Sequence, residues 1–432
     1  MRFFAQRADT DAPSGTQPSV PAAPFPELFR LTVLVLLVGE MFVYYDARPN
    51  VFPHINLYLL VNLLLLVLAV LPWRQAPTLL WALAWPLGAL MRWDWATRFT
   101  RSDVYWATTQ AVTFLLHGQN PYTHVPTLVY TYQPGAVNYP TYSYFPGTLI
   151  AEIPFYLLGN VRLGLALAEI GTALLLYLLA RPRIDIWPAR SIAVFWLLFL
   201  PGFHVPLRLG IIDSLLLFWI ALAVYLYGKG KIVGSALAAA MVMATKQYGV
   251  IFALPWAILL LQPLGEHLRT RRYGGGRGRA IVASIPQEVW LPPVVGVLLA
   301  AAVILPLASL SPNAFLDATI LNHGRETPRP MLGTPQWNES IAAQLVALGW
   351  LRLGAATVIA RVASVTALLW AAGMAVIRTH DPASALRWAT VLGVMAFAFS
   401  GAEVQFFYWR LPVFLFALYT VAQWSGGTSG RG

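Results

Sequence analysis

The chain alternates between long apolar runs and shorter polar gaps. The apolar runs cover residues 28–45, 55–72, 77–91, 163–180, 191–207, 211–227, 231–246, 248–262, 290–310, 354–378, 385–400 and 404–424. Because about 20 mostly apolar residues cross a bilayer as a helix, this pattern predicts an all-α, polytopic membrane protein with about twelve spans. The runs 77–91 and 248–262 are short enough to tilt or to insert only in part.

Composition supports lipid as the solvent. Hydrophobic residues make up 58% of the 432 residues and charged residues only 11%, whereas soluble domains carry roughly 25% charged residues. The net charge of +11 does not indicate a nucleic-acid partner, because the basic residues fall in gaps between apolar runs and form no contiguous face. Without cysteine, the chemistry of the chain is restricted to oxygen and nitrogen groups.

The basic gaps predict the orientation. The Gly-rich segment 263–288 contains five arginines, so the positive-inside rule places it in the cytoplasm. Counting spans from this segment puts both termini inside as well. The Pro-rich residues 1–26 are interpreted as a disordered cytoplasmic tail and 425–432 as a flexible tail, which leaves 27–424 as one transmembrane domain.

The same count places two long polar stretches, 92–162 and 311–353, outside the cell. In the first stretch we expect an interfacial helix after Arg101, with Ser102 or Asp103 as its N-cap and Gly118 as its breaker. Only one crossing fits between residue 143 and the basic turn near 181. The run 145–158 is therefore assigned to a second interfacial or re-entrant helix, and 163–180 to the span.

Asp103 has two interpretations. As a helix cap it would stabilise the first interfacial helix and do no chemistry. As a general base at the membrane surface it would take the proton from a sugar hydroxyl while that oxygen attacks an anomeric carbon.

Short motifs follow Asp103 in a particular order. They are Tyr105, Gly118-Gln119-Asn120-Pro121-Tyr122, Tyr139-Pro140, Gly210-Ile211-Ile212-Asp213, Thr245-Lys246 and Asn338-Glu339-Ser340. In this order they resemble the GT-C superfamily of membrane glycosyltransferases, in particular glycosyltransferase family 87, which includes polyprenyl-phosphate-mannose-dependent mannosyltransferases. The likeness extends from about residue 100 to 412. The chain departs from that family in having three spans before the first outer loop, Gly-Ile-Ile-Asp for Gly-Gln-x-Asp, and Tyr-Pro-Thr for Tyr-Pro-Pro.

The resemblance implies a GT-C fold with two large extracytoplasmic loops that contain interfacial helices. The implied activity is the transfer of a hexose or pentose, such as mannose, from a polyprenyl-phosphate donor to a lipid or glycan acceptor, with inversion. Asp103 would be the base and His323 an auxiliary residue, although a lone loop histidine is often structural. The residues expected to bind substrate are Tyr105, Asn120, Tyr122, Tyr139, Asp213, Trp337, Asn338 and Glu403.

A lipid phosphate needs cations at the outer headgroup level, and the candidates are Lys246, Arg208 and Arg410. Lys246 is 15 positions after Lys231, which is about 23 Å along a helix, so the two approach opposite membrane faces. The same spacing argument places Asp213 at the outer face. The alternatives are a structural pair between Asp213 and a Lys or Arg, and a snorkelling Arg410 beside Glu403.

Other classes of function fit less well. The chain has no phosphate-binding Gly loop after a strand, so no nucleotide-sugar site is predicted, and no cofactor or metal is expected. The expected partners are the donor, the acceptor and membrane lipids. A transporter or lipid flippase is the alternative, and it would favour repeated halves with broken helices meeting at mid-membrane. A non-catalytic scaffold would not require Asp103, Asp213 and Lys246 to converge.

Overall fold

The computed structural model describes residues 25–46, 55–70, 73–97, 102–124, 142–199, 206–272, 286–321, 340–400 and 406–424, which form helices and turns and no strand. The longer helices are α1 (Phe25–Asp46), α2 (Ile55–Val70), α3 (Ala76–Thr97), α6 (Arg162–Ala180), α7 (Ile186–Leu198), α9 (Asp213–Gly228), α10 (Ile232–Thr245), α11 (Val250–Arg272), α13 (Gln287–Leu310), α17 (Leu353–Arg378), α18 (Pro382–Ala398) and α19 (Arg410–Trp424). The other helical segments are α4 (Asp103–Leu116), α5 (Pro146–Leu157), η2 (Gln247–Gly249), α14 (Pro312–Leu316), η3 (Asp317–Leu321), α16 (Ile341–Ala347) and η4 (Phe406–Trp409).

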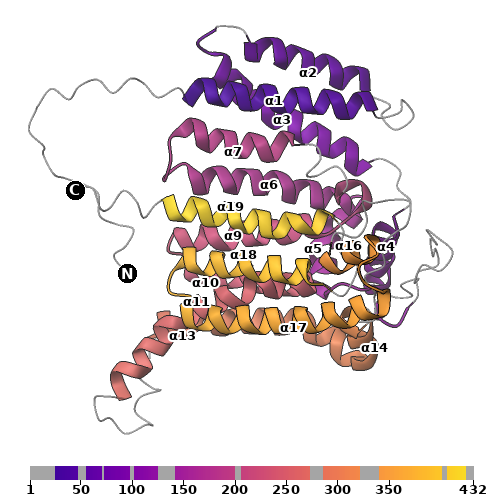
Figure 1. The fold of residues 1–432 in the computed structure, drawn as a ribbon, viewed down its shortest axis with the longest axis vertical. Helices are drawn as coiled ribbons and strands as arrows, with labels where there is room; N and C mark the ends of the chain where they lie inside the picture. The colour runs from indigo at the N-terminus through magenta and orange to yellow at the C-terminus, as the bar shows by residue number, and fades with distance from the viewer. Residues whose placement is uncertain are drawn as a thin grey trace, which may run out of the picture.

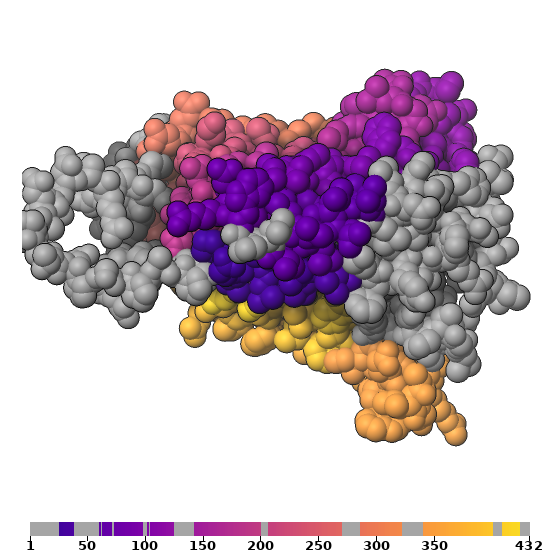
Figure 2. All heavy atoms as spheres, turned by 90° about the horizontal axis from the view of Figure 1, so that it is seen from above, coloured from indigo at the N-terminus to yellow at the C-terminus, as the bar shows by residue number. Residues whose placement is uncertain are grey.

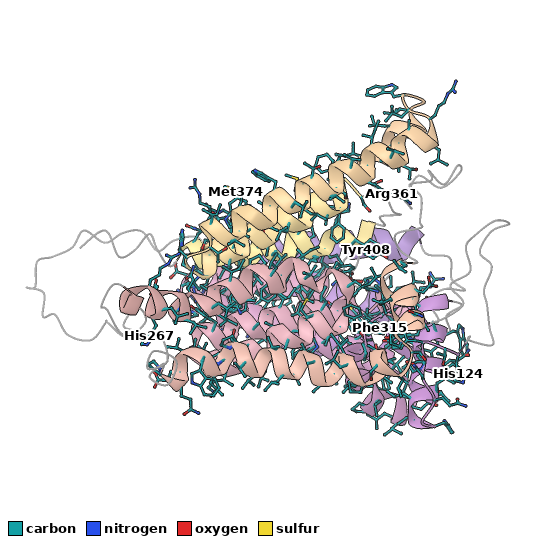
Figure 3. All side chains as sticks on the ribbon, turned by 90° about the horizontal axis from the view of Figure 1, so that it is seen from below. His124, His267, Phe315, Arg361, Met374 and Tyr408 are labelled. Atoms are coloured by element: carbon teal, nitrogen blue, oxygen red, sulfur yellow. The ribbon has the colours of Figure 1, made fainter. Side chains whose placement is uncertain are left out.

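The longer helices lie side by side in one bundle (Figure 1). Within it, α6 packs against α7 and α9, α10 packs against α9 and α13, and α18 packs against α11, α17 and α19. The segments α4, α5, α14 and α16 gather at one end of the bundle, which we call the α4 end (Figure 1). His124 and Phe315 lie at this end, and His267 lies at the opposite end (Figure 3).

Four helical stretches in the described residues are long and apolar enough to cross a membrane. They are α6, the run Gln247–Arg269 within η2 and α11, α13 and α17. Shorter apolar helices accompany them, namely α7, α9, α10, α18 and α19. The all-helical character and the presence of helices that could span a membrane agree with the sequence analysis. The figure of about twelve spans stays a prediction.

Each predicted apolar run contains a helix, but some boundaries were wrong. α3 continues to Thr97 and includes Arg92 and Asp94, which were assigned to a loop; both are buried, and Arg92 contacts α7. The polar stretch that was predicted to begin at residue 92 therefore begins after this helix. α7 begins earlier than the predicted run and covers Ile186–Leu198, while residues 200–205 of that run lie outside the described residues. α11 continues past residue 262 to Arg272 and so includes part of the basic segment.

The interior contains two large apolar clusters. One joins α6, α9, α10, α11, α17, α18 and α19 around the fully buried Trp256, and the other joins α1, α2, α3, α6, α7 and α9 around the fully buried Phe29. On their other faces, α2, α13 and α17 expose large apolar side chains such as Val297 and Leu369, as a lipid-facing helix does. α1–α3 form one face of the molecule, and the region around α16 projects from the bundle (Figure 2).

At the α4 end, the start of α5 is fastened to the turn between α10 and α11. The Thr148 hydroxyl donates a hydrogen bond of 2.8 Å to the Thr245 carbonyl, and the Gln247 amide donates to the Ser143 carbonyl. Gly147 allows this approach, because a Cβ at that position would overlap the backbone of α10. The contact brings residues 142–148 over the end of α10.

Gly147→Ala is expected to destabilise the protein, because the added methyl would overlap the carbonyl of Ala244, which is backbone and cannot rotate away. Overpacking of this kind typically costs about 1–3 kcal/mol. Gly373→Ala is the matched control, since nothing lies within 4 Å of a Cβ at that helical position and alanine is the better helix former. Thermal unfolding of both variants in detergent measures the difference. Equal midpoints would contradict the close contact between α5 and α10.

Candidate functional site

The α4 end contains two buried sets of charges. The first is a pair between Lys246 Nζ and Asp213 Oδ2 at 3.0 Å, and the two side chains are only 4% and 3% exposed. Asp213 begins α9, and Lys246 directly follows α10. A helix N-terminus favours a carboxylate and a helix C-terminus favours a cation, so both helix ends stabilise the charges that the pair requires.

Aromatic rings surround the ammonium group of Lys246. The ring centroids of Tyr144, Tyr248 and Tyr408 lie 5.3, 4.4 and 4.9 Å from Nζ. These tyrosines come from three separate segments, namely the residues before α5, η2 and η4. Cation–π attraction is strongest where water is excluded, and together with Asp213 it offsets the loss of hydration at Lys246.

The second set is centred on Glu169 of α6, whose side chain is 1% exposed. Arg410 Nη2 lies 2.6 Å from Glu169 Oε1, and Arg92 Nη2 lies 3.8 Å from Oε2. The hydroxyl of Ser214 donates to Oε1 at 2.6 Å. Because Ser214 follows Asp213 in the chain, the two sets are neighbours. We call Arg92, Glu169, Arg410, Asp213, Lys246 and Ser214 the buried charge network.

Arg92 also holds the backbone of neighbouring helices. Its guanidinium donates to the carbonyls of Leu197 at 2.7 Å and Trp196 at 2.8 Å, both in the last turn of α7, and to Gly88 at 3.1 Å within α3. The last carbonyls of a helix have no intrahelical donor. Arg92 therefore donates hydrogen bonds to backbone carbonyls at the end of α7 while its charge faces Glu169. Its contacts connect α3, α6 and α7.

Three of the predicted site residues meet in this network. Asp213 pairs with Lys246, which is the arrangement that the structural interpretation of these charges expected. Arg410 contacts Glu169 and is only 13% exposed, so its guanidinium does not snorkel towards the surface on its own. Pairing does not exclude anion binding, since an ion-paired arginine keeps further N–H groups for a ligand.

Tyr105 and Arg208 lie beside the network and not within it. The side chain of Arg208 is exposed, and its carbonyl accepts a hydrogen bond of 3.2 Å from Arg162. The guanidinium of Arg162 in turn covers the ring of Tyr105 at 4.5 Å. The expected cluster of Lys246, Arg208 and Arg410 is therefore made of two buried cations and one exposed cation.

Asp103 is the first residue of α4, and Ser102 occupies the N-cap position. The hydroxyl of Ser102 donates to the Leu209 carbonyl at 2.6 Å instead of capping the helix. At the other end, Gly118 has a φ of +73° and terminates the helix as predicted. The first turn of α4 thus lies against the segment that leads into Asp213, while the side chain of Asp103 is outside the described residues.

Asn120 and Tyr122, two residues expected to bind substrate, build the turn after α4. Asn120 Oδ1 accepts a hydrogen bond of 3.0 Å from the backbone N–H of Tyr122, as in an Asx turn. Tyr122 is 1% exposed, packs edge-on against Phe315 at 4.9 Å and donates to the Tyr144 carbonyl at 2.7 Å. In this structure both residues support Tyr144 and its position over Lys246.

Five predicted site residues lie outside the described residues, namely Tyr139, His323, Trp337, Asn338 and Glu403. The roles expected of them stay predictions.

Glu169, Arg92 and Glu152 were not among the site residues predicted from the sequence. A usable signal was present for Glu169, because an ionisable residue in the middle of an apolar run faces a protein partner more often than lipid. Glu152 of α5 is 1% exposed, and neither of its carboxyl oxygens has a hydrogen-bond partner among the described residues. Burial raises the pKa of Glu152 well above its usual value, because a buried site disfavours the charged carboxylate.

No protein-family model, no curated protein and no solved structure matches the chain. The case for a function therefore rests on the residues and on the geometry of the buried charge network.

The raised pKa of Glu152 predicts a pH-dependent stability. Between the ordinary carboxyl pKa of 4.5 and the raised value, the folded state binds one more proton than the unfolded state, so stability falls as pH rises. Glu152→Gln mimics the neutral acid and should flatten the decline of the thermal midpoint from pH 5 to pH 8. Glu288→Gln, at an exposed carboxylate, should leave the slope unchanged. Parallel curves for wild type and Glu152→Gln would count against a buried neutral acid.

Proposed function

We propose that the chain is a membrane glycosyltransferase that moves a sugar from a polyprenyl-phosphate donor to a lipid or glycan acceptor. The buried charge network is the observation that carries this proposal. It contains three cations, Arg92, Lys246 and Arg410, against two carboxylates, Glu169 and Asp213. Arg410 Nη1 is buried and has no hydrogen-bond partner among the described residues, and such a group is costly. A phosphodiester of a sugar and a polyprenol carries a negative charge and oxygen acceptors that would pair with these cations.

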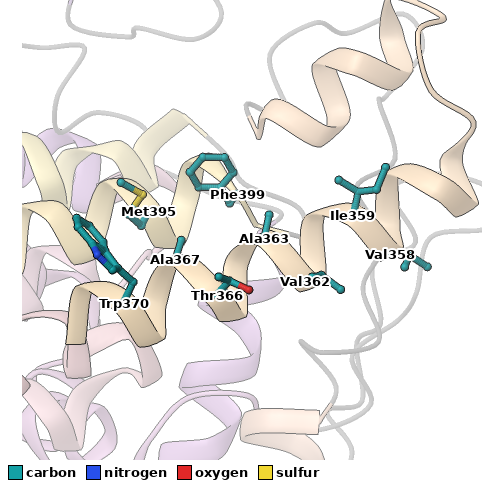
Figure 4. A pocket seen from close by; sticks show the side chains of 9 residues that line it. All are labelled: Val358, Ile359, Val362, Ala363, Thr366, Ala367, Trp370, Met395 and Phe399. Atoms are coloured by element: carbon teal, nitrogen blue, oxygen red, sulfur yellow. The ribbon is translucent and has the colours of Figure 1, made fainter. Parts of the chain in front are cut away.

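An apolar groove between α17 and α18 supports a substrate with a long hydrocarbon chain. The groove measures about 700 Å³ and runs between α17 and α18, with Val362, Trp370, Met395 and Phe399 among its lining residues (Figure 4). Phe397 of α18 lies between the lining residues Met395 and Phe399 in the chain and stacks on Tyr408 at 5.9 Å. The Tyr408 ring in turn covers Lys246, so α18 connects the groove with the ring over that cation.

The proposed reaction is a direct displacement at the anomeric carbon. Asp103 takes the proton from the acceptor hydroxyl, the acceptor oxygen bonds to the anomeric carbon, and the bond from that carbon to the phosphate oxygen breaks. The polyprenyl phosphate leaves with the electron pair, and Lys246 and Arg410 stabilise its growing charge. The contact of Ser102 with Leu209 favours this assignment, because it holds the first turn of α4 near the start of α9. A single displacement inverts the anomeric centre.

The α4 end is proposed to face the outside of the cell. Turns at the opposite end contain Arg181, Arg183, Lys229 and Lys231, as expected of a cytoplasmic surface. A network at one end of the bundle favours chemistry at one membrane surface. Transporters instead place their substrate site near the bilayer midplane, so transport is the less favoured function.

Lys246 is predicted to bind the donor through its charge. Lys246→Met should weaken donor binding roughly tenfold or more, the value of a lost charge-assisted hydrogen bond. Because the single change leaves Asp213 unpaired, the double variant Asp213→Asn/Lys246→Met removes both charges and controls for loss of fold. Lys231→Met, at an exposed lysine of the opposite end, should bind donor as wild type does. Undiminished binding by both Lys246 variants would make the residue purely structural.

Asp103→Asn separates the two interpretations of that residue. A general base typically contributes about 10²- to 10⁴-fold, so transfer should collapse by that factor while donor affinity and thermal stability persist. If Asp103 only stabilises the helix, Asp103→Asn should leave transfer intact. Asparagine keeps the size of the side chain, and the loss of a charge at a helix end lowers the free energy of unfolding by well under about 1 kcal/mol. Transfer rate, donor affinity and thermal midpoint are measured on the same preparation. Near-wild-type transfer would remove Asp103 from the mechanism.

A further inference from the structure

The guanidinium of Arg410 is held on one side and unpartnered on the other. Nη2 contacts Glu169 Oε1 at 2.6 Å, and the indole ring of Trp196 lies 5.3 Å from the guanidinium carbon. Nη1 is buried and has no hydrogen-bond partner among the described residues. A buried N–H group without an acceptor is costly, so Nη1 is the part of this side chain that a ligand oxygen would satisfy.

Glu169 is itself held from two directions. Ser214 donates to the same oxygen that Arg410 contacts, and Arg92 lies behind the other oxygen. Arg92 cannot easily move, because three backbone carbonyls hold it, two of them in α7. The orientation of Arg410 therefore depends on α3, α6, α7 and α9, although Arg410 itself belongs to α19.

We propose that Glu169 is a positioning residue, which fixes the Arg410 guanidinium so that Nη1 is presented to the phosphate group of the lipid donor. This inference rests on the proposed function, and it assigns Glu169 no contact with the reacting atoms. A free arginine loses rotamer freedom when it binds a ligand. Holding the side chain in its bound orientation beforehand removes that loss from the binding step.

Simple electrostatics and positioning predict opposite effects of removing Glu169. The carboxylate is negative, so its removal raises the positive potential around Arg410, and Coulomb attraction alone would make an anion bind more tightly. If Glu169 acts by orienting Arg410, its removal makes the same anion bind more weakly. The sign of the change therefore distinguishes the two accounts.

The test measures binding of a short-chain isoprenyl phosphate to the purified full-length protein, with the matching isoprenol as the uncharged control. Wild type should prefer the phosphate. Glu169→Gln should weaken phosphate binding about tenfold without changing isoprenol binding, and Arg410→Met should weaken it by at least as much. The double variant Glu169→Gln/Arg410→Met should bind as Arg410→Met does, because Glu169 acts only through that arginine.

Ser214→Ala provides a milder variant in case Glu169→Gln does not fold. It removes one hydrogen bond to Glu169 and should weaken phosphate binding about two- to threefold, with no further effect in the Arg410→Met background. The inference is overturned if a folded Glu169→Gln protein binds the phosphate as well as wild type does, or more tightly. If only Ser214→Ala folds, the same result for that variant overturns it. Additive effects of either change with Arg410→Met would also overturn it. Wild type that binds the phosphate no better than the isoprenol would instead reject the phosphate site, and the inference with it.

Discussion

Charged side chains remain inside an apolar helical bundle only where opposite charges or hydrogen bonds replace the water that they lose. This constraint organises the α4 end of the molecule. Glu169 lies between Arg92 and Arg410, and Asp213 lies against Lys246. Each partner belongs to a different helix or helix end, so the ion pairs also determine which helices must be neighbours. Apolar packing alone would permit many arrangements of similar helices, whereas these pairs permit few.

Hydrogen bonds between uncharged groups then hold the rest of the α4 end around the buried charge network. Thr148 and Gln247 fasten residues 142–148 to the end of α10, and Tyr122 supports Tyr144 from behind. Ser102 ties the first turn of α4 to the segment before α9. Through these contacts, Tyr144 lies over Lys246 and Asp103 lies at the edge of the same region. A lipid-linked anionic substrate, as proposed, would use the buried charges, the apolar groove and the proposed base.

Helices could be predicted from the sequence because lipid imposes a one-dimensional pattern, in which each span must be apolar along most of its length. The same reasoning failed where the folded chain provides a buried charge with hydrogen-bond or ion-pair partners. Arg92 and Asp94 were assigned to a loop, yet α3 continues through them, and hydrogen bonds to carbonyls of α7 compensate for the burial of Arg92. Glu169 and Arg410 are separated by 241 positions, so no local spacing could reveal their pairing. Lys246 and Asp213 were placed at one membrane face by helix length alone, but whether they would pair had to be left open.

Transfer of a sugar from a lipid phosphate, as proposed, is tested most directly with purified protein in detergent or liposomes. The protein is supplied with a polyprenyl phosphate carrying a labelled sugar and with a membrane lipid extract as acceptor. The account predicts a labelled product of inverted anomeric configuration and release of polyprenyl phosphate, with no product from a nucleotide sugar. Movement of the intact donor across the liposome membrane without cleavage of the bond between sugar and phosphate would contradict it and would favour a flippase.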